Sequence, residues 1–179
     1  KTMIEHVYKR AALADFIDAV YVATPNFEIK DKVEEFGGNV VMTSDKHIRA
    51  TERVAEAAII LGDVYDIVVN LQGDEPLVNP DLLKMAIAPF FENENICCVN
   101  LAREINYEAA KDVHDVKVVC DKNDNALYFS REPIPSKFLS KDDYPYLCEI
   151  CIMPFTKKSL QLYTQLKMYP LEDRESIDM

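Results

Sequence analysis

The chain has 179 residues, 49% of them hydrophobic and 28% charged, which is typical of one globular domain with a sizeable core. Its formal net charge of −11 argues against a nucleic-acid groove, because such a groove needs clustered Lys and Arg. No apolar run approaches the roughly 20 residues of a membrane span, and the mixed charges near Lys1 do not form a signal peptide. We therefore expect a cytoplasmic protein with neither nucleic acid nor membrane as a partner.

Helices and strands are predicted to alternate along the first half of the chain. Apolar residues recur with a helical period in several segments, and short β-branched runs separate these segments. Turn signals such as Pro25-Asn26 and Gly37-Gly38 fall between them. This alternation is typical of an α/β fold with a mostly parallel sheet and helices on both faces. The predicted helices are 3–16, 27–36, 51–61 and 80–91, and the predicted strands are 18–24, 39–43, 66–71 and 96–102.

The middle of the chain departs from this alternation. Strands are predicted at 116–121, 125–130 and 146–155, and Lys122-Asn123-Asp124 would join the first two as a hairpin. Such an antiparallel excursion, here 116–155, serves as a substrate lid, a dimer contact or a plain sheet edge, and the pattern does not choose among the three. Two more helices are predicted, at 157–167 and from Pro170 onward.

The cysteines are five in number and unevenly spaced, which favours reduced thiols over a disulfide framework. Cys148 and Cys151 have the spacing of a redox or zinc motif, "CEIC", but this motif lies in a predicted strand. Residues three apart on a strand face opposite sides, and no second pair completes a zinc site. We therefore expect no zinc here.

Ligands of open parallel sheets bind beyond the carboxyl ends of the strands. The loops to consider are therefore Thr24–Asn26, Thr43–Thr51 and Gln72–Asn79. In the second, "TSDKHIRATER" concentrates basic side chains in an acidic chain. We predict Thr51 as the N-cap of the following helix, whose free N–H groups suit an anion or a base edge. A solvated basic loop fits the same pattern equally well.

The third loop, "NLQGDEPLVNP", offers a candidate metal ligand. Asp74 follows Gly73, which allows the backbone to turn tightly against a ligand. One carboxylate together with substrate phosphates is a common way of holding Mg²⁺. Glu75 is expected to support the turn or to face solvent. A plain strand-to-helix turn would have the same residues, so the pattern alone leaves both interpretations open.

Several stretches resemble the sugar-acid cytidylyltransferases, in particular those acting on 3-deoxy-manno-octulosonate (Kdo). They include "GGNVVMTSDKHIRATERVAEA", "VVNLQGDEPLVNPDLL", "VKVVCDKNDNALYFSREPIP" and "YPLEDRESIDM", in the order typical of that family. The resemblance implies a nucleotide-diphospho-sugar-transferase-like α/β domain over 1–179 and a cytoplasmic homodimer. It also implies that CTP and a 3-deoxy-2-ulosonic acid react, with Mg²⁺, to give a CMP-sugar and pyrophosphate for lipopolysaccharide-type surface glycans.

The same resemblance implies roles for particular residues. Asp74 would bind Mg²⁺, and the guanidinium fork of Arg131 would suit the sugar carboxylate. The implied catalytic residues are Asp74, Arg131 and Lys117; the nucleotide-binding residues are Thr24, His47, Thr51 and Arg53; and the sugar-binding residues are Gln72, Ser130, Arg131, Glu149 and Glu172.

The sequence departs from the family pattern in three places. The phosphate-binding loop and a later Asp of the magnesium site lie outside 1–179, so we expect the sequence to be part of a longer protein. Arg49-Ala50 replaces a Ser-Gly pair, which leaves strict CTP selectivity open. Glu149 replaces a His, and a carboxylate there prefers an amine or a hydroxyl, which suggests an amino-ulosonic or other altered acid. Another nonulosonic acid, or a non-catalytic nucleotide- or sugar-binding role, are the remaining alternatives.

Overall fold

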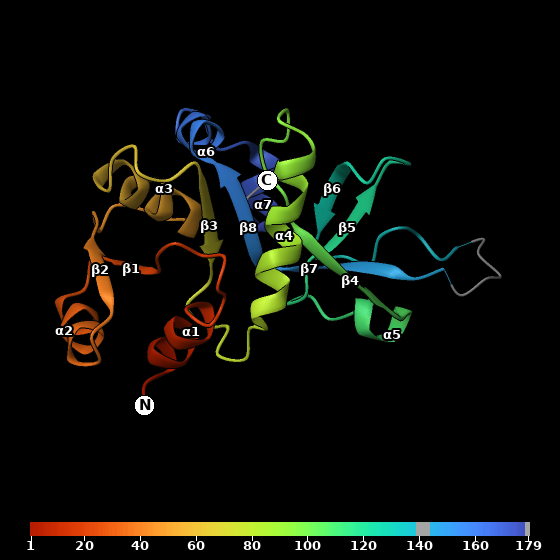
Figure 1. Cartoon of the computed structure of the whole chain (residues 1–179). Helices are drawn as coiled ribbons and strands as arrows, with labels where there is room; N and C mark the ends of the chain where they lie inside the picture. Colours follow the sequence, from red (N-terminus) through yellow and green to blue (C-terminus); the bar gives the residue numbers. More distant parts are fainter. Residues whose placement is uncertain (139–143, 178–179) are drawn as a thin grey trace. The chain divides into compact units, whose positions relative to one another are not determined.

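The structure is a computed structural model that describes residues 1–138 and 144–177 (Figure 1). Its contacts divide the chain into two compact units. The first comprises Lys1–Val99 and Cys151–Leu166, and the second comprises Asn100–Ile150 and Lys167–Met179. Within the described ranges, none of the helices combines the length and the apolar character that crossing a membrane requires.

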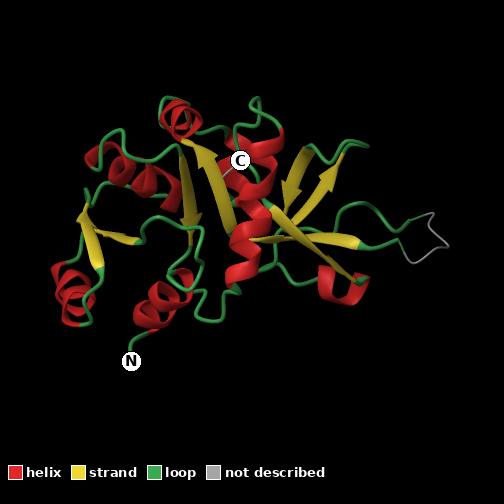
Figure 2. Ribbon diagram, viewed as in Figure 1, coloured by secondary structure: helices red, strands yellow, loops and turns green. Residues whose placement is uncertain are grey.

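The first unit carries most of the helices (Figures 1 and 2). β1 and β2 form a parallel pair, and β3 pairs with β8 in antiparallel orientation. The core includes Ala55, Ala58, Met153, Phe155 and Leu160, contributed by α3, β8 and α6. The elements of this unit are α1 (Met3–Ala11), β1 (Tyr21–Thr24), α2 (Phe27–Glu35), β2 (Asn39–Met42), α3 (Ala50–Ile60), β3 (Ile67–Leu71), α4 (Pro80–Glu92), β8 (Ile152–Thr156) and α6 (Lys157–Tyr163).

Side-chain caps explain why two of these helices begin where the sequence predicts. The Asn26 side chain accepts hydrogen bonds from the N–H groups of Glu28 and Ile29, at 2.7 and 3.2 Å. Asn79 caps α4 in the same way, and Pro80 follows at the first helical position, where its missing N–H has no cost. The predicted starts of α2 and α4 are therefore confirmed.

The second unit is built on a four-stranded antiparallel sheet with the order β4-β7-β5-β6. The predicted hairpin of β5 and β6 is confirmed, and its turn residue Asp124 has a φ of 61°. Ile105, Ala110, Tyr146 and Cys148 form the core. The elements are β4 (Leu101–Ile105), α5 (Tyr107–Ala110), β5 (Lys117–Cys120), β6 (Ala126–Ser130), β7 (Tyr146–Ile150) and α7 (Pro170–Glu175).

The strand pairing differs from the mostly parallel sheet that the sequence predicts. Among the described strands, β1 and β2 form the parallel pair, whereas β3–β8, β4–β7, β5–β6 and β5–β7 are antiparallel. β8 returns along β3 after the excursion. Local periodicity indicates where a strand lies but not which distant strand pairs with it.

Two predicted strands have the wrong bounds. In 96–102, Cys98 forms an isolated bridge with Phe155, and β4 itself starts at Leu101 and continues into exposed Arg103 and Glu104. An apolar run could not reveal that polar continuation. The run 146–155 breaks at Cys151 into β7 and β8, which belong to different units.

All five cysteines are free thiols.

Candidate active site

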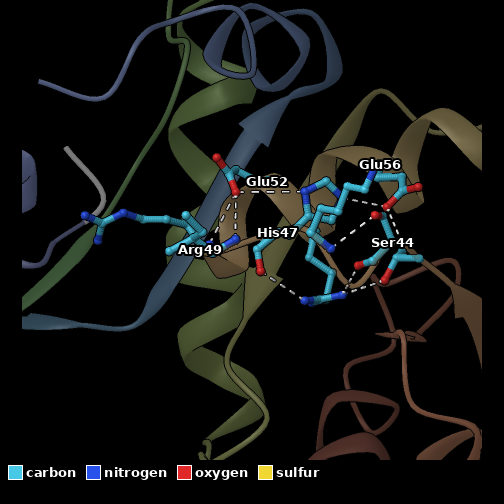
Figure 3. A network of polar contacts seen from close by, with 9 residues as sticks. Ser44, His47, Arg49, Glu52 and Glu56 are labelled. Atoms are coloured by element: carbon cyan, nitrogen blue, oxygen red, sulfur yellow. Dashed lines mark hydrogen bonds and ion pairs between the residues drawn. The ribbon is translucent and has the colours of Figure 1, made fainter.

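The basic loop between β2 and α3 is anchored by carboxylates of α3 (Figure 3). Oε2 of Glu56 accepts hydrogen bonds from the Ser44 N–H at 2.7 Å and from Nε2 of His47 at 2.6 Å. Oε2 of Glu52 accepts the N–H groups of Ile48 and Arg49, at 3.1 and 3.3 Å. The loop therefore has a defined shape rather than being simply solvated.

Arg53 points back into this loop. Its Nη1 donates to Oγ1 of Thr43 at 2.9 Å and to the carbonyl of Ser44 at 2.8 Å, and its Nη2 donates to the carbonyl of His47 at 3.4 Å. The guanidinium thus holds the loop together. In contrast, the exposed ammonium of Lys46 makes no hydrogen bond or ion pair with any residue that the structure describes. Lys46 is therefore the loop cation available to an anionic ligand.

The N–H of Ser44, and next the His47 side chain, lower the pKa of Glu56 below its ordinary value. Glu56 is therefore ionised at neutral pH. An ionised carboxylate accepts stronger hydrogen bonds than a neutral one, so this charge strengthens its contacts with the loop.

The predicted N-cap at Thr51 is wrong. The N-cap of α3 is Arg49, and Thr51 is a fully buried residue within the helix. Its Oγ1 accepts a hydrogen bond from Nδ2 of Asn70, at 3.1 Å, which ties α3 to β3. Glu52, by accepting N–H groups ahead of the helix, performs the capping that the pattern assigned to Thr51.

Thr24 is also buried, at 4% exposure. Its hydroxyl accepts the N–H of Asn26 at 3.1 Å, and its carbonyl accepts the N–H of Thr43. These contacts join the ends of β1 and β2. Thr24 thus shapes the end of the β1–β2 pair, and its hydroxyl is buried and occupied by the N–H of Asn26.

A cavity of about 770 Å³ lies within the first unit, between residues of α1, α3, β1 and β3. Three of the predicted site residues line it, namely Arg53, Gln72 and Asp74, whereas Thr24, His47 and Thr51 do not. Asp74 is exposed, and its side chain makes no hydrogen bond or ion pair with the described residues. Its carboxylate is therefore accessible to a metal ion or to another cation.

The glycine preceding Asp74 is not required by the backbone. Gly73 does not have a left-handed φ, and a Cβ at this position would meet Cδ1 of Ile4 at 3.5 Å, an ordinary contact. The expected turn is present, since Gly73 and Asp74 are turn residues and the N–H of Glu75 donates to the carbonyl of Gln72 at 3.4 Å, but it does not depend on the conformational freedom of glycine.

In the second unit, Lys117 is fully buried at the start of β5. Its ammonium donates to the carbonyls of Asp112 and Asp115, both at 2.7 Å, and to the carbonyl of Arg131. Burial lowers the pKa of Lys117. Since all three ammonium hydrogens have backbone acceptors, this geometry does not support direct contact with a substrate.

The guanidinium of Arg131 is engaged in a similar way. It donates to the carbonyls of Val113 and Glu175, at 3.0 and 2.7 Å, and to those of His114 and Ser176, at 3.4 and 3.0 Å. A fork occupied by carbonyls is not open to the carboxylate of a sugar. The role predicted for Arg131 as a carboxylate partner is therefore not supported by this geometry.

Ser130 and Glu172 also have partners. The Ser130 hydroxyl, at 2% exposure, donates to Oε1 of Glu175 at 2.9 Å and accepts the N–H of Glu132. Glu172 accepts the N–H of Tyr169 at 3.3 Å, which caps α7. The structure thus brings Lys117, Ser130 and Arg131 into one network, together with Glu175.

Glu149 lies on β7 opposite Ala102 of β4. Its Oε1 accepts Nδ2 of Asn100 at 2.6 Å. The other polar atom of that amide, Oδ1, is buried and has no hydrogen-bond partner among the described residues. Asn100 therefore presents an unsatisfied acceptor beside a carboxylate.

Sequence reasoning missed four residues of these networks: Glu52, Glu56, Asn100 and Glu175. The three glutamates lie on helices, where a charged side chain usually faces solvent, and no local pattern distinguishes them. Asn100 lies in a segment whose strand bounds were predicted incorrectly. The spacing of Glu52 and Glu56, four residues apart on one helix face, is the one signal that could have paired them with the loop.

Comparison with known proteins identifies the class. The geometry alone gives an α/β protein with an anchored basic loop before α3 and an accessible carboxylate after β3. The chain belongs to the cytidylyltransferase family, whose family model matches residues 1–178. It is therefore an enzyme of the nucleotidyltransferase class.

Curated relatives and solved structures match along nearly the whole chain. The 8-amino-3,8-dideoxy-manno-octulosonate cytidylyltransferase of Shewanella pealeana is 42% identical, over 99% of this chain and 74% of its own length. The 3-deoxy-manno-octulosonate cytidylyltransferase of Acaryochloris marina is 38% identical, over 99% and 72%. The solved structure of CMP:2-keto-3-deoxy-manno-octonic acid synthetase complexed with CTP matches with a TM-score of 0.91 and 33% identity, over 99% and 73%. This likeness confirms the expected α/β fold.

Proposed function

We propose that this protein transfers CMP from CTP to a 3-deoxy-2-ulosonic acid of the Kdo class, giving a CMP-sugar and pyrophosphate. The structural likeness to the synthetase complexed with CTP, at a TM-score of 0.91, carries this proposal. The names of the relatives, which specify Kdo or its 8-amino form, support the same substrate class. A CMP-sugar of this kind would supply the synthesis of surface glycans of the lipopolysaccharide type.

The reaction is a phosphoryl-type transfer without a covalent protein intermediate. A hydroxyl oxygen of the sugar forms a bond to the α-phosphorus of CTP, the bond to the bridging oxygen breaks, pyrophosphate leaves, and the hydroxyl proton is released. Such chemistry depends on positioning and on stabilising negative charge. The loop anchored by Glu52 and Glu56 would bind the nucleotide, with His47 fixed in place and Lys46 facing its phosphates.

Asp74 fits a role in holding Mg²⁺. The described residues contain no group of three or more His, Cys, Asp or Glu that could bind a metal by themselves. Mg²⁺ is usually bound by one or two carboxylates plus substrate phosphates, and an exposed Asp74 offers one such carboxylate. When bound, the ion would offset negative charge on the phosphates. Gln72, which lines the same cavity, would contact the sugar.

Pyrophosphate release tests the proposal. The full-length enzyme would be incubated with Mg²⁺, CTP and a panel of ulosonic acids, and the CMP-sugar would be identified by mass spectrometry. We expect release with CTP and a Kdo-class acid, and none without the acid. Absence of release with every acid would contradict the proposal. Replacing CTP by UTP or ATP in the same assay tests base selectivity, which Arg49-Ala50 leaves open.

A second candidate substrate is an amino-ulosonic acid. Glu149 and the unsatisfied Oδ1 of Asn100 are acceptors, and an ammonium group, which only donates, suits them. The Shewanella pealeana relative is named for an 8-amino substrate. A higher kcat/KM for the 8-amino acid than for Kdo, lost in Glu149→Gln, would support this candidate. Equal values for the two acids would exclude it.

We also propose a cytoplasmic homodimer, as the resemblance implies. Light scattering coupled to size-exclusion chromatography of the full-length protein would give its mass in solution. A monomer at micromolar concentration would contradict the dimer.

A further inference from the structure

The last turn of α1 is tied to the loop that carries Asp74. Nε of Arg10 donates to the carbonyl of Val78 at 2.6 Å, across 68 positions of the chain. Val78 is buried, at 5% exposure, and immediately precedes Asn79, the N-cap of α4. A side chain of α1 therefore anchors this loop where it enters α4.

Two successive turns connect this anchor to Asp74. The N–H of Val78 donates to the carbonyl of Glu75 at 3.1 Å, and the N–H of Glu75 donates to the carbonyl of Gln72 at 3.4 Å. Asp74 lies inside the turn from Gln72 to Glu75. Because Glu75 belongs to both turns, a shift of Val78 is passed along these hydrogen bonds to the turn that presents Asp74.

The same helix also flanks the other end of the loop. Cδ1 of Ile4 lies beside Gly73, where a Cβ would meet it at an ordinary contact distance. Ile4 lines the cavity of the first unit together with Gln72 and Asp74. α1 thus supports the Asp74 loop at its start and at its end, within one compact unit.

We infer that Arg10 is a positioning residue for the carboxylate of Asp74, acting through the carbonyl of Val78. The inference rests on the proposed function, in which Asp74 holds Mg²⁺. Since the side chain of Asp74 has no hydrogen bond or ion pair among the described residues, the backbone of its loop sets where the carboxylate lies. The charge of the guanidinium strengthens the hydrogen bond that fixes this backbone. Arg10 itself contacts neither the ion nor a substrate.

The charge of Arg10 also suits the end of a helix, and Lys9 offers the matched control for that effect. The helix dipole favours a cation in the last turn, and both residues occupy the last turn of α1. The ammonium of Lys9, however, pairs with Glu5 one turn earlier, at 2.6 Å, and lies over the ring of Phe36. Lys9→Met therefore removes the same charge from the helix and leaves the anchor of the loop intact.

Arg10→Met in the full-length enzyme tests the inference. The Kd for CTP would be measured by isothermal titration calorimetry without the sugar acid, once with Mg²⁺ and once with EDTA. With Mg²⁺ we expect Arg10→Met to raise this Kd about fivefold, because a displaced carboxylate holds the ion less well. With EDTA the Kd should stay within about twofold of the wild type, since no metal ion is then bound. Asp74→Asn should show the same pattern.

Further variants separate positioning from stability. Lys9→Met should keep both Kd values within about twofold of the wild type. Arg10→Lys, whose ammonium still donates to a carbonyl, should restore the Kd measured with Mg²⁺. A merely structural role of Arg10 would lower the number of binding sites and leave the Kd of the remaining sites unchanged in both conditions. That result would overturn the inference.

Two other outcomes are equally decisive. If Arg10→Met does not fold, Arg10→Gln gives the same comparison, and a wild-type dependence of its CTP affinity on Mg²⁺ would overturn the inference. If Mg²⁺ does not tighten CTP binding even in the wild-type enzyme, the proposed metal site itself is contradicted, and the inference with it.

Discussion

Lys117 and Arg131 divide four successive backbone carbonyls between them. The ammonium of Lys117 binds the outer two carbonyls of the segment 112–115, and the guanidinium of Arg131 binds the inner two. Lys117 also donates to the carbonyl of Arg131 itself. These two cations, for which the resemblance implies catalytic roles, thus hold the segment 112–115 against the end of β6.

Lys117→Met should therefore destabilise the protein. Methionine fills a similar volume, but it leaves three partly buried carbonyls without their donor. We expect the free energy of unfolding to fall by about 3 kcal/mol, measured by urea denaturation. Lys122→Met, at an exposed position of the hairpin turn, is the control. A loss below about 0.5 kcal/mol for Lys117→Met would show that the network contributes little to stability.

Glu56→Gln should weaken nucleotide binding. The amide keeps one acceptor for the Ser44 N–H but loses the charge that strengthens both contacts of the loop. We expect the KM for CTP to rise about fivefold, with little change in the KM for the sugar acid. Glu28→Gln, in the exposed first turn of α2, provides a control of equal charge. If Glu56→Gln kept the wild-type KM for CTP, the anchoring of the loop by Glu56 would not contribute to nucleotide binding, and the prediction would be contradicted.

Asp74→Asn should abolish most of the turnover while leaving the fold intact. The side chain is exposed and has no hydrogen bond or ion pair among the described residues, so thermal unfolding should be unchanged. Loss of a metal-binding charge should lower kcat by at least about 100-fold. Glu75→Gln tests whether the neighbouring carboxylate matters. Near-normal turnover of Asp74→Asn would exclude Asp74 as the magnesium ligand.

Acid should destabilise the protein through Glu56 and Glu175. Both carboxyl groups have a pKa below the ordinary value of 4.5 in the folded chain, so the unfolded chain binds more protons between the two values. Their contribution to stability is complete above the unfolded pKa and is lost as the pH falls through the folded one. The N–H of Arg131 is the largest cause of the lowered pKa of Glu175. The free energy of unfolding, measured by urea denaturation below pH 4.5, should therefore fall as the pH falls. This fall with pH should be less steep in Glu175→Gln than in Asp173→Asn, which removes an exposed carboxylate of α7. Equal slopes would contradict it.

Local signals determined which parts of the fold were predictable. Asn26 and Asn79 mark helix starts because their side chains bind the first free N–H groups, and such signals lie within a few residues. The pairing of β3 with β8 joins segments more than eighty positions apart in the chain, and no local pattern encodes it. The break at Cys151 was hidden because apolar residues continue on both sides.

The sequence predicted where the candidate site lies better than it predicted what each of its side chains does. His47 and Arg53 were expected in one loop, and the structure places them in one network. The direction of a long side chain, however, depends on acceptors that folding brings near. Arg53 turns inward because the carbonyls of Ser44 and His47 lie within its reach, and Arg131 does so because α7 ends beside it.

Anchoring from α3 makes the loop tolerant of substitution at its tip. Glu52 and Glu56 hold it largely by main-chain N–H groups, which every residue except proline supplies. The side chains of Asp45, Lys46 and Ile48 are exposed and add little to that hold. These three positions could therefore be randomised together in search of an altered nucleotide preference. The loop would keep its shape, because the residues of α3 that anchor it would not be changed.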